Sequence, residues 1–293
     1  MTPPQILDAT ELLRRIAARV PLDLRTNVVI IGSIATAWSF RDMSGTATVA
    51  TKDIDLLLRP AVDAIATAET LAKQLFEMDW QPVYPNDRKP GTLDTPEEEL
   101  PALRLSPPEE RDGWFVELLG EPQAGQTARR AWRRFDTPLG AFALPCFRYM
   151  PVAIDGAAAT EYGIRTAQPA RMALAHMLEH ADPDTTPISG LSGNPARFLK
   201  DVGRAIALWW LASEQSSVAD EAWLAQWRDT LATLYPNSQA EMKAAARSGL
   251  SSVGDYLPSA HAIALNSVLA PHGTTLDAYR RAHASLLKLI DQL

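Results

Sequence analysis

Apolar and polar residues follow two different periods in the first part of the chain. Residues 28–32 (VVIIG) form a β-branched run that ends in glycine, which predicts a strand and a tight turn. Residues 33–41 (SIATAWSFR) then place apolar side chains at helical spacing and predict a helix. Residues 42–50 are small and polar and predict a loop, whereas residues 51–59 (TKDIDLLLR) predict a second strand. Residues 61–79 predict a helix, because their apolar positions recur at steps of three and four.

The next hundred residues predict more of the same sheet. A further strand is expected near residues 81–84, and residues 85–101 predict an exposed loop because they are rich in proline, acidic residues and turn formers. Residues 102–106 (ALRLS) and 114–119 (WFVELL) flank a polar turn and predict a hairpin. Residues 140–145 (GAFALP) predict one more short strand.

Long helical patterns begin at Gln168 and continue to the end of the chain. Breaks are expected at residues 182–195, 235–236 and 270–273, where turn formers and proline gather. Asn194 is followed by proline and predicts a helix start, because asparagine can cap the free backbone amides and proline forfeits no hydrogen bond there.

The length of 293 residues favours about two domains, or one domain with a substantial appendage. We predict an α+β fold in which residues 1–165 form a mixed sheet flanked by helices and residues 166–293 form a helical domain. No segment approaches the roughly 20 apolar residues that cross a bilayer. Residues 1–20 predict an amphipathic helix without the features of a signal peptide. We therefore expect a cytoplasmic protein that does not associate with a membrane.

Charge and cysteine content narrow the classes of function. The net charge of −7 and the isoelectric point near 5.3 disfavour a broad nucleic-acid surface. The densest basic cluster, residues 127–135 (TARRAWRRF), is interpreted as a solvated helix face or a contact for the acidic residues 97–99, with phosphate binding as the alternative. Cys146 is the only cysteine, which excludes an internal disulfide and a multi-cysteine zinc site, and we expect it to be buried.

Two carboxylates mark the second predicted strand. Side chains alternate across a strand, so Asp53 and Asp55 point to one face while Ile54 and Leu56 point to the other. Two close carboxylates repel each other unless water or a cation compensates them, and Mg²⁺ takes one or two carboxylates together with phosphate oxygens. The pattern favours a metal site. The alternative is that Asp53 caps the strand and Asp55 is solvated on an edge.

Gly32 and Ser33 stand where the first predicted strand turns into a helix. Glycine allows an anion to approach the backbone, and the free amides at a helix start favour phosphate. A Gly-Ser turn by itself is also typical of an ordinary turn. It becomes informative because the next strand carries the acidic pair.

The combination of IIGSIATAWSF (30–40) and TKDIDLLL (51–58) resembles the nucleotidyltransferase superfamily related to DNA polymerase β. The family pattern is an apolar strand, Gly-Gly or Gly-Ser, a helix, and then Asp-x-Asp on the next strand. A third carboxylate follows on a later strand, and Glu117 in FVELL takes that place. Nineteen residues, 34 to 52, separate the two motifs and imply an inserted loop at 42–50.

The resemblance implies a role for each residue of these motifs. Asp53 and Asp55 would hold two Mg²⁺ ions, and Glu117 would complete the site and help deprotonate the incoming hydroxyl. Gly32 and Ser33 would contact the terminal phosphates. The fold implied is a nucleotidyltransferase-like mixed sheet followed by a helical C-terminal domain.

The helical half carries a looser similarity. Residues 166–180 and 196–210 resemble the family's appended helices, of which the second often carries Lys-Asp, here Lys200 and Asp201. His176 stands where a lysine is common in the first helix. The polar face of the second helix could meet a triphosphate or form a solvated surface with local ion pairs. It consists of Arg197, Lys200, Asp201 and Arg204.

His176, Glu179 and His180 form a competing motif. They spell H-x-x-E-H, the inverted zinc-protease pattern, with both histidines on one helical face. No third ligand is signalled downstream, so helix-surface or core-edge histidines are the other interpretation. The tryptophans of the helical half, at positions 209, 210, 223 and 227, fall at helical spacing and predict core packing.

The leading hypothesis is a Mg²⁺-dependent nucleotidyltransferase that moves a nucleoside monophosphate from an NTP to a hydroxyl. The acceptor could be a small molecule, an RNA end or a protein, and an antitoxin-like protein partner is compatible with this class. The first alternative is a non-catalytic nucleotide-binding or partner-binding module of the same fold. The remote alternative is a zinc-dependent hydrolase that uses His176, Glu179 and His180.

Overall fold

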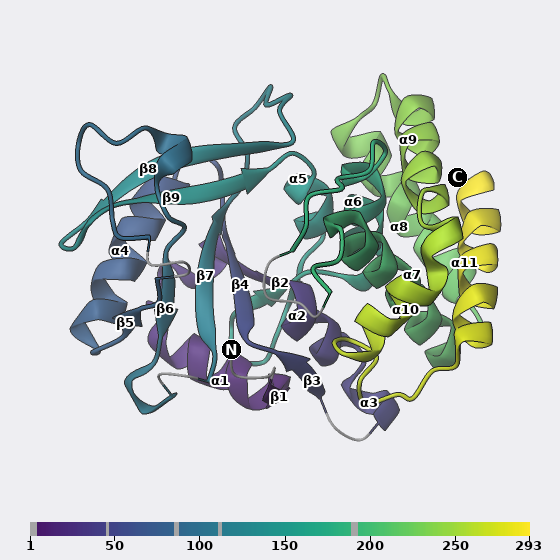
Figure 1. The fold of residues 1–293 in the computed structure, drawn as a ribbon, viewed down its shortest axis with the longest axis horizontal. Coiled ribbons are helices and arrows are strands. Elements are labelled where there is room, and N and C mark those ends of the chain that lie inside the picture. Colours follow the sequence, from purple (N-terminus) through teal and green to yellow (C-terminus); the bar gives the residue numbers. More distant parts are fainter. Residues whose placement is uncertain (1–4, 45–46, 85–87, 111–112, 189–192) are drawn as a thin grey trace.

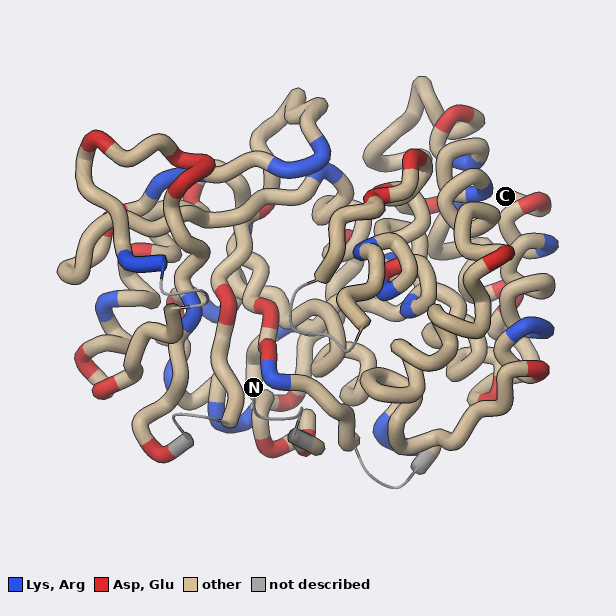
Figure 2. Tube along the Cα trace, in the orientation of Figure 1, with Lys and Arg blue, Asp and Glu red and all other residues tan. Residues whose placement is uncertain are grey.

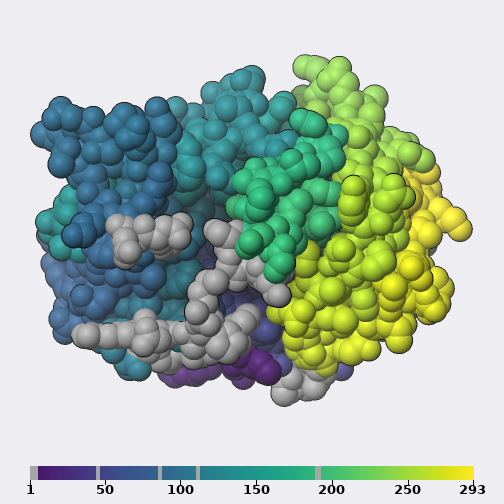
Figure 3. All heavy atoms as spheres, viewed as in Figure 1, coloured from purple at the N-terminus to yellow at the C-terminus, as the bar shows by residue number. Residues whose placement is uncertain are grey.

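The computed structural model describes residues 5–44, 47–84, 88–110, 113–188 and 193–293 (Figure 1). Its first part combines a mixed sheet with helices, and its last part, from α6 to α11, is helical. Figure 3 shows atoms of the two parts packed against each other at the top of this face. The predicted mixed α and β architecture is confirmed, while the domain boundary between residues 165 and 166 stays a prediction. Among the described residues, no helix is both long and apolar enough to cross a lipid bilayer.

Three strands at the centre of the sheet position the candidate residues. They are β2 (Val28–Ile31), β4 (Asp53–Leu58) and β7 (Phe115–Gly120). β4 lies between β2, which is antiparallel to it, and β7, which is parallel. All of β2 is buried, whereas β4 and β7 alternate between half-buried and buried positions before their last three residues, which are buried. The half-buried positions are therefore the ones where the sheet can carry polar side chains.

The other strands extend this sheet on both sides. The order is β10-β11-β2-β4-β7-β6-β5, with β9 beside β7 and β8 beside β9. A separate small sheet pairs β1 with β3 in antiparallel fashion. The bounds of these strands are β1 (Gln5–Asp8), β3 (Thr48–Thr51), β5 (Gln81–Pro82), β6 (Arg104–Ser106), β8 (Arg130–Thr137), β9 (Gly140–Phe147), β10 (Ala158–Ala159) and β11 (Arg165–Thr166).

The helices of the first part begin and end where the local chemistry requires. The carboxylate of Asp8 accepts hydrogen bonds from the backbone N–H groups of Thr10 at 2.8 Å and Glu11 at 3.1 Å, which caps α1. α4 buries the apolar face that the sequence predicts. The bounds are α1 (Ala9–Arg19), α2 (Gly32–Ser39), α3 (Arg41–Ser44), α4 (Ala64–Glu77) and α5 (Met150–Ile154), with short 3₁₀ helices at Arg25–Asn27, Glu97–Glu99 and Pro108–Glu110.

The helices of the last part pack around α7. This helix contacts α6, α8, α10 and α11. Trp209, Trp223 and Trp227 are buried and meet edge to face, with ring centroids 5.0 and 5.6 Å apart, and Trp210 packs partly buried against the same core. The prediction of core tryptophans is confirmed. The bounds are α6 (Pro169–Glu179), α7 (Arg197–Gln215), α8 (Ala219–Leu234), α9 (Gln239–Ser251), α10 (Leu257–Leu265) and α11 (Leu276–Asp291), with a 3₁₀ helix at Gly254–Tyr256.

Four local predictions are wrong. Residues 1–20 do not form a single helix, because Gln5–Asp8 is the strand β1 and α1 begins at Ala9. Residues 42–50 are not a simple loop, because α3 ends and β3 begins within them; Val49 is buried, so packing outweighs the polar composition. The arginine-rich residues 127–135 form no helix but largely the strand β8, which pairs along its whole length with the apolar β9. Asn194 does not cap α7, since Ala196 occupies the cap position and Asn194 takes a left-handed φ of 44°.

The predicted hairpin is confirmed, because β6 pairs antiparallel with β7. The predicted loop 85–101 is exposed only in part. Residues 85–87 lie outside the described residues, while Leu100 is buried at the end of the loop. Arg134 on β8 fixes the middle of this loop by donating hydrogen bonds to the carbonyl oxygens of Thr92, at 3.0 Å, and Thr95.

Candidate functional site

The sheet register brings the predicted carboxylates together. Asp55 on β4 lies directly opposite Glu117 on the parallel strand β7, and Asp53 lies opposite Phe115. Paired residues on neighbouring strands point to the same face, so Asp53, Asp55 and Glu117 share one side of the sheet. Ile54 is fully buried on the other side. Figure 2 shows acidic positions on β4 and β7, with basic positions on α7 across from them.

Gly32 places the start of α2 against this acidic face. Its φ is +71°, in the left-handed region that glycine occupies without strain. A Cβ atom at Gly32 would lie 2.7 Å from Asp55 Oδ2 and 3.7 Å from Arg204 Nη1. The backbone at this turn therefore approaches the Asp55 carboxylate more closely than a residue with a Cβ atom would allow, whereas Arg204 lies at ordinary contact distance.

Ser33 and Arg204 link α2 to α7. Ser33 is buried, and its Oγ accepts a hydrogen bond of 3.1 Å from Arg204 Nη2. Lys200 lies one turn earlier on α7 and acts electrostatically on both Asp53 and Asp55. The predicted residues Gly32, Ser33, Asp53, Asp55 and Lys200 are therefore neighbours in space.

The two aspartates differ in protonation. Burial by itself would raise the pKa of Asp53, but Lys200, the Thr51 hydroxyl 2.7 Å away and Arg204 hold that pKa below its usual range. Burial, assisted by the charges of Asp53 and Glu117, raises the pKa of Asp55 to about 7. The site thus holds one firmly ionised carboxylate and one that is poised to take up a proton near neutral pH.

Glu117 has a protein partner that the sequence did not single out. Arg104 Nε donates a hydrogen bond of 2.6 Å to Glu117 Oε2, and the two residues are opposite each other on β6 and β7. The Arg104 guanidinium also lies over the ring of Phe115, 5.1 Å from its centroid. The predicted hairpin could have indicated this partner, because Arg104 and Glu117 have opposite charges and face each other on the same side of it.

The donor set fits a hard cation at Asp53 and Asp55. Their oxygens are the ligand type that Mg²⁺ prefers, and Asp55 gains most from a nearby positive charge because its ionised form is disfavoured. Within the described residues, no group of three or more histidine, cysteine, aspartate and glutamate side chains is arranged to hold a metal. The two-ion site with Glu117 as a ligand stays a prediction.

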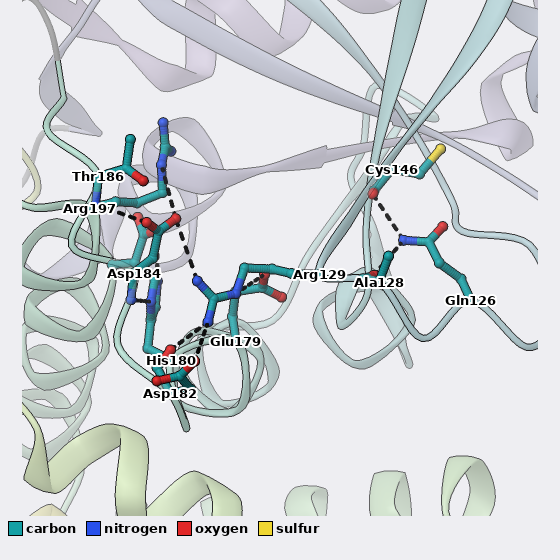
Figure 4. Close-up of polar contacts among 11 residues, drawn as sticks. Gln126, Ala128, Arg129, Cys146, Glu179, His180, Asp182, Asp184, Thr186 and Arg197 are labelled. Atoms are coloured by element: carbon teal, nitrogen blue, oxygen red, sulfur yellow. Dashed lines mark hydrogen bonds and ion pairs between the residues drawn. The ribbon is translucent and has the colours of Figure 1, made fainter. Parts of the chain in front are cut away.

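His180 is engaged by protein on both sides of its ring. It is fully buried, and its Nε2 lies 3.1 Å from Asp201 Oδ2. Its Nδ1 accepts a hydrogen bond of 3.4 Å from the backbone N–H of Asp184 (Figure 4). Burial lowers the pKa of His176 to about 3. Both ring nitrogens of His180 are therefore hydrogen-bonded. The Asp201 carboxylate contacts His180 at the end of α6 and not the carboxylates on β4.

The arginine cluster holds loops in place. Arg129 lies between Glu179 and Asp184, 3.7 Å from a carboxylate oxygen of each (Figure 4). Arg130 lies over the ring of Phe147, 4.8 Å from its centroid. Arg133 donates a hydrogen bond of 2.7 Å to the carbonyl oxygen of Ala61. Arg129 and Arg133 therefore hold separate parts of the fold together, while phosphate binding by this cluster stays the untested alternative.

Cys146 is fully buried on β9, and burial raises the pKa of its thiol to about 11. A thiol in this state is not a nucleophile at neutral pH. The prediction that Cys146 is buried is confirmed.

Comparison with known proteins assigns the chain to no family. No family model, curated protein or solved structure matches the chain. The functional interpretation therefore depends on the residues around Gly32 and Asp55 and on their geometry.

Proposed function

We propose that the chain is a Mg²⁺-dependent nucleotidyltransferase. It would move a nucleoside monophosphate from an NTP to a hydroxyl and release pyrophosphate. The observation that carries the proposal is the close approach of the Gly32 turn to Asp55, with Arg204 beside this turn and Lys200 acting electrostatically on the same carboxylate. This arrangement combines carboxylates for a metal with free amides and cations for phosphates, which a triphosphate donor needs.

Each part of the site has a task in this proposal. The backbone at Gly32 admits the phosphates to the start of α2, and Ser33, Arg204 and Lys200 neutralise their charge. Asp53 and Asp55 hold Mg²⁺, which when bound neutralises phosphate charge and lowers the pKa of the acceptor hydroxyl. Most of the catalysis would then come from positioning and charge neutralisation.

Glu117 is proposed to act on the acceptor. Arg104 engages its Oε2 and fixes the carboxylate, which leaves Oε1 to take the proton from the incoming hydroxyl. The sheet with this site would correspond to a nucleotidyltransferase-like core, and residues 166–293 to its helical C-terminal domain. The acceptor would be a small molecule, an RNA end or a protein.

A non-catalytic nucleotide-binding module is the second candidate. The observation that favours it is the 2.6 Å hydrogen bond between Arg104 and Glu117, because this bond occupies an oxygen of the carboxylate that a transferase would need as a base or metal ligand. Such a module would still bind Mg²⁺ and NTP through Asp53 and Asp55 but would transfer nothing.

The test is a transfer assay with radiolabelled nucleotides. Wild-type protein is incubated with Mg²⁺, a cell extract and each NTP, labelled at either the α- or the γ-phosphate. We expect the α-label to enter an acceptor and the γ-label to leave as pyrophosphate. Asp53→Asn should abolish transfer, while the exposed Asp23→Asn should not. Nucleotide binding without any transfer of α-label would favour the module, and transfer by Asp53→Asn would contradict the assignment.

A further inference from the structure

A cavity of about 460 Å³ lies where the end of α2 meets β10, the end of α7 and the start of α8. It has the size of a pocket for a small organic ligand. None of the residues of the acidic site lines this cavity. Those residues are Gly32, Ser33, Asp53, Asp55, Glu117, Lys200 and Arg204. Its outer residues, such as Gln215, Ser216 and Glu161, are exposed, so the cavity can be reached from solvent.

Gln226 on α8 contributes an unpartnered acceptor to this cavity. Its side-chain Oε1 is buried and has no hydrogen-bond partner among the residues that the structure describes. A buried acceptor without a donor is unfavourable, and nearly all such groups in folded proteins are satisfied by protein, water or ligand. A ligand that brings an N–H group into the cavity would satisfy this oxygen.

Arg41 contributes an available cation. Its guanidinium lies over the ring of Trp38, 4.1 Å from the centroid, and its Nη1 donates a hydrogen bond of 2.8 Å to the Trp38 carbonyl oxygen. In the part of the chain that the structure describes, Arg41 forms no ion pair. The stacked guanidinium therefore keeps donors on its remaining edge, in the fork geometry that suits phosphate or carboxylate.

The rest of the lining suits a flat, partly apolar body. Trp223 is buried beneath the cavity, and Phe40 and Pro169 add apolar surface. Gln168 also lines the cavity and supplies an amide that can both donate and accept a hydrogen bond. The cavity thus joins a cation, amide groups and aromatic surface within one small volume.

We propose that this cavity binds a small organic anion of the nucleoside monophosphate class, with its phosphate at Arg41 and an N–H group of its base at Gln226. All the common nucleobases carry such a donor, and the aromatic lining accommodates a planar ring. The site is separate from the one at Asp53 and Asp55, so the two proposals can fail independently.

Calorimetric titration of the full chain in EDTA tests this proposal. The probes are AMP, adenosine, ribose 5-phosphate and inorganic phosphate, which separate recognition of the base from recognition of the phosphate. We expect AMP to bind more tightly than the other probes. Arg41→Ala should weaken AMP binding about tenfold, the loss expected for one charge-assisted contact. Gln226→Met, of similar volume, should weaken AMP and adenosine but leave ribose 5-phosphate unchanged.

Control variants show whether the heat of AMP binding comes from the cavity. Arg14→Ala removes an exposed arginine on α1 and should leave AMP binding unchanged. Arg41→Lys keeps the charge and should bind with intermediate affinity, which covers the case in which Arg41→Ala fails to fold by circular dichroism. The proposal would be overturned if wild type did not bind AMP at about 5 mM. It would also be overturned if the single variants Arg41→Lys and Gln226→Met both bound AMP as tightly as wild type does. Loss of binding in Lys200→Ala alone would also overturn it, because AMP would then occupy the acidic site.

Discussion

Replacing Asp55 with asparagine should stabilise the protein above neutral pH. The pKa of Asp55 is raised from 3.8 to about 7 in the folded chain, a shift of about three units. At 1.36 kcal/mol per unit, this shift corresponds to about 4 kcal/mol of unfavourable energy when the carboxylate is ionised. Asp55 keeps some contact with solvent, so we expect about 2–4 kcal/mol in practice.

The sign of the pH dependence follows from proton binding. Between pH 4 and pH 7 the folded state keeps a proton on Asp55 that the unfolded state has lost, so this group makes the free energy of unfolding fall as pH rises. Above pH 7 both states are ionised, and its contribution is constant. Asp53 behaves oppositely, because its lowered pKa gives stability that is lost only as pH falls below about 4.

Urea unfolding of wild type and Asp55→Asn from pH 4 to pH 9 in EDTA measures this effect. The difference between the two proteins should grow from pH 4 to pH 7 in favour of the variant and then stay level. Burial also raises the pKa of Glu179 to about 7, but this group is present in both proteins and cancels in the difference. Asp23→Asn serves as the exposed control. Parallel curves for wild type and Asp55→Asn would refute the assignment of a disfavoured charge to Asp55.

Three further predictions address the same site. Gly32→Ala should lower the free energy of unfolding by about 2–3 kcal/mol, because the left-handed φ of Gly32 and its contact with Asp55 both oppose a Cβ atom. The contact would be contradicted if Gly32→Ala shifted the urea midpoint equally in wild type and in an Asp55→Ala background. Glu117→Gln should keep most Mg²⁺-dependent NTP binding but reduce transfer about 100-fold in the labelling assay, and unchanged transfer would remove its role as a base. Metal analysis of the purified protein should give substoichiometric zinc, because both ring nitrogens of His180 are hydrogen-bonded; one zinc per chain would revive the hydrolase alternative.

Elements with strong periodicity could be predicted from the sequence. The β2 strand, the α2 and α4 helices and the acidic strand β4 stand where their apolar patterns place them, because both faces of each element meet a consistent environment. β8 could not be predicted in this way. Its arginines look like a solvated helix face, and only pairing with the apolar β9, together with loop carbonyls that accept their hydrogen bonds, makes a strand favourable.

The candidate site could also be predicted only in part. Asp53 and Asp55 could be assigned to one face from strand alternation, since this depends on neighbouring residues alone. The partners of the predicted residues could not be assigned, because Arg104 reaches Glu117 from another strand and Arg204 reaches Ser33 from a helix 171 residues later. Asp201 shows the converse, since its place in a familiar Lys-Asp pair does not reveal that it pairs with His180.

Calorimetric titration of Mg²⁺ and each NTP into the protein at pH 8 tests the central claim most directly. We expect wild type to bind one NTP per chain only when Mg²⁺ is present. We also expect Asp53→Asn, still folded by circular dichroism, to bind at least about tenfold more weakly. Binding that is equally tight in EDTA, or equally tight in Asp53→Asn, would contradict the assignment of a metal and nucleotide site to the acidic face of β4.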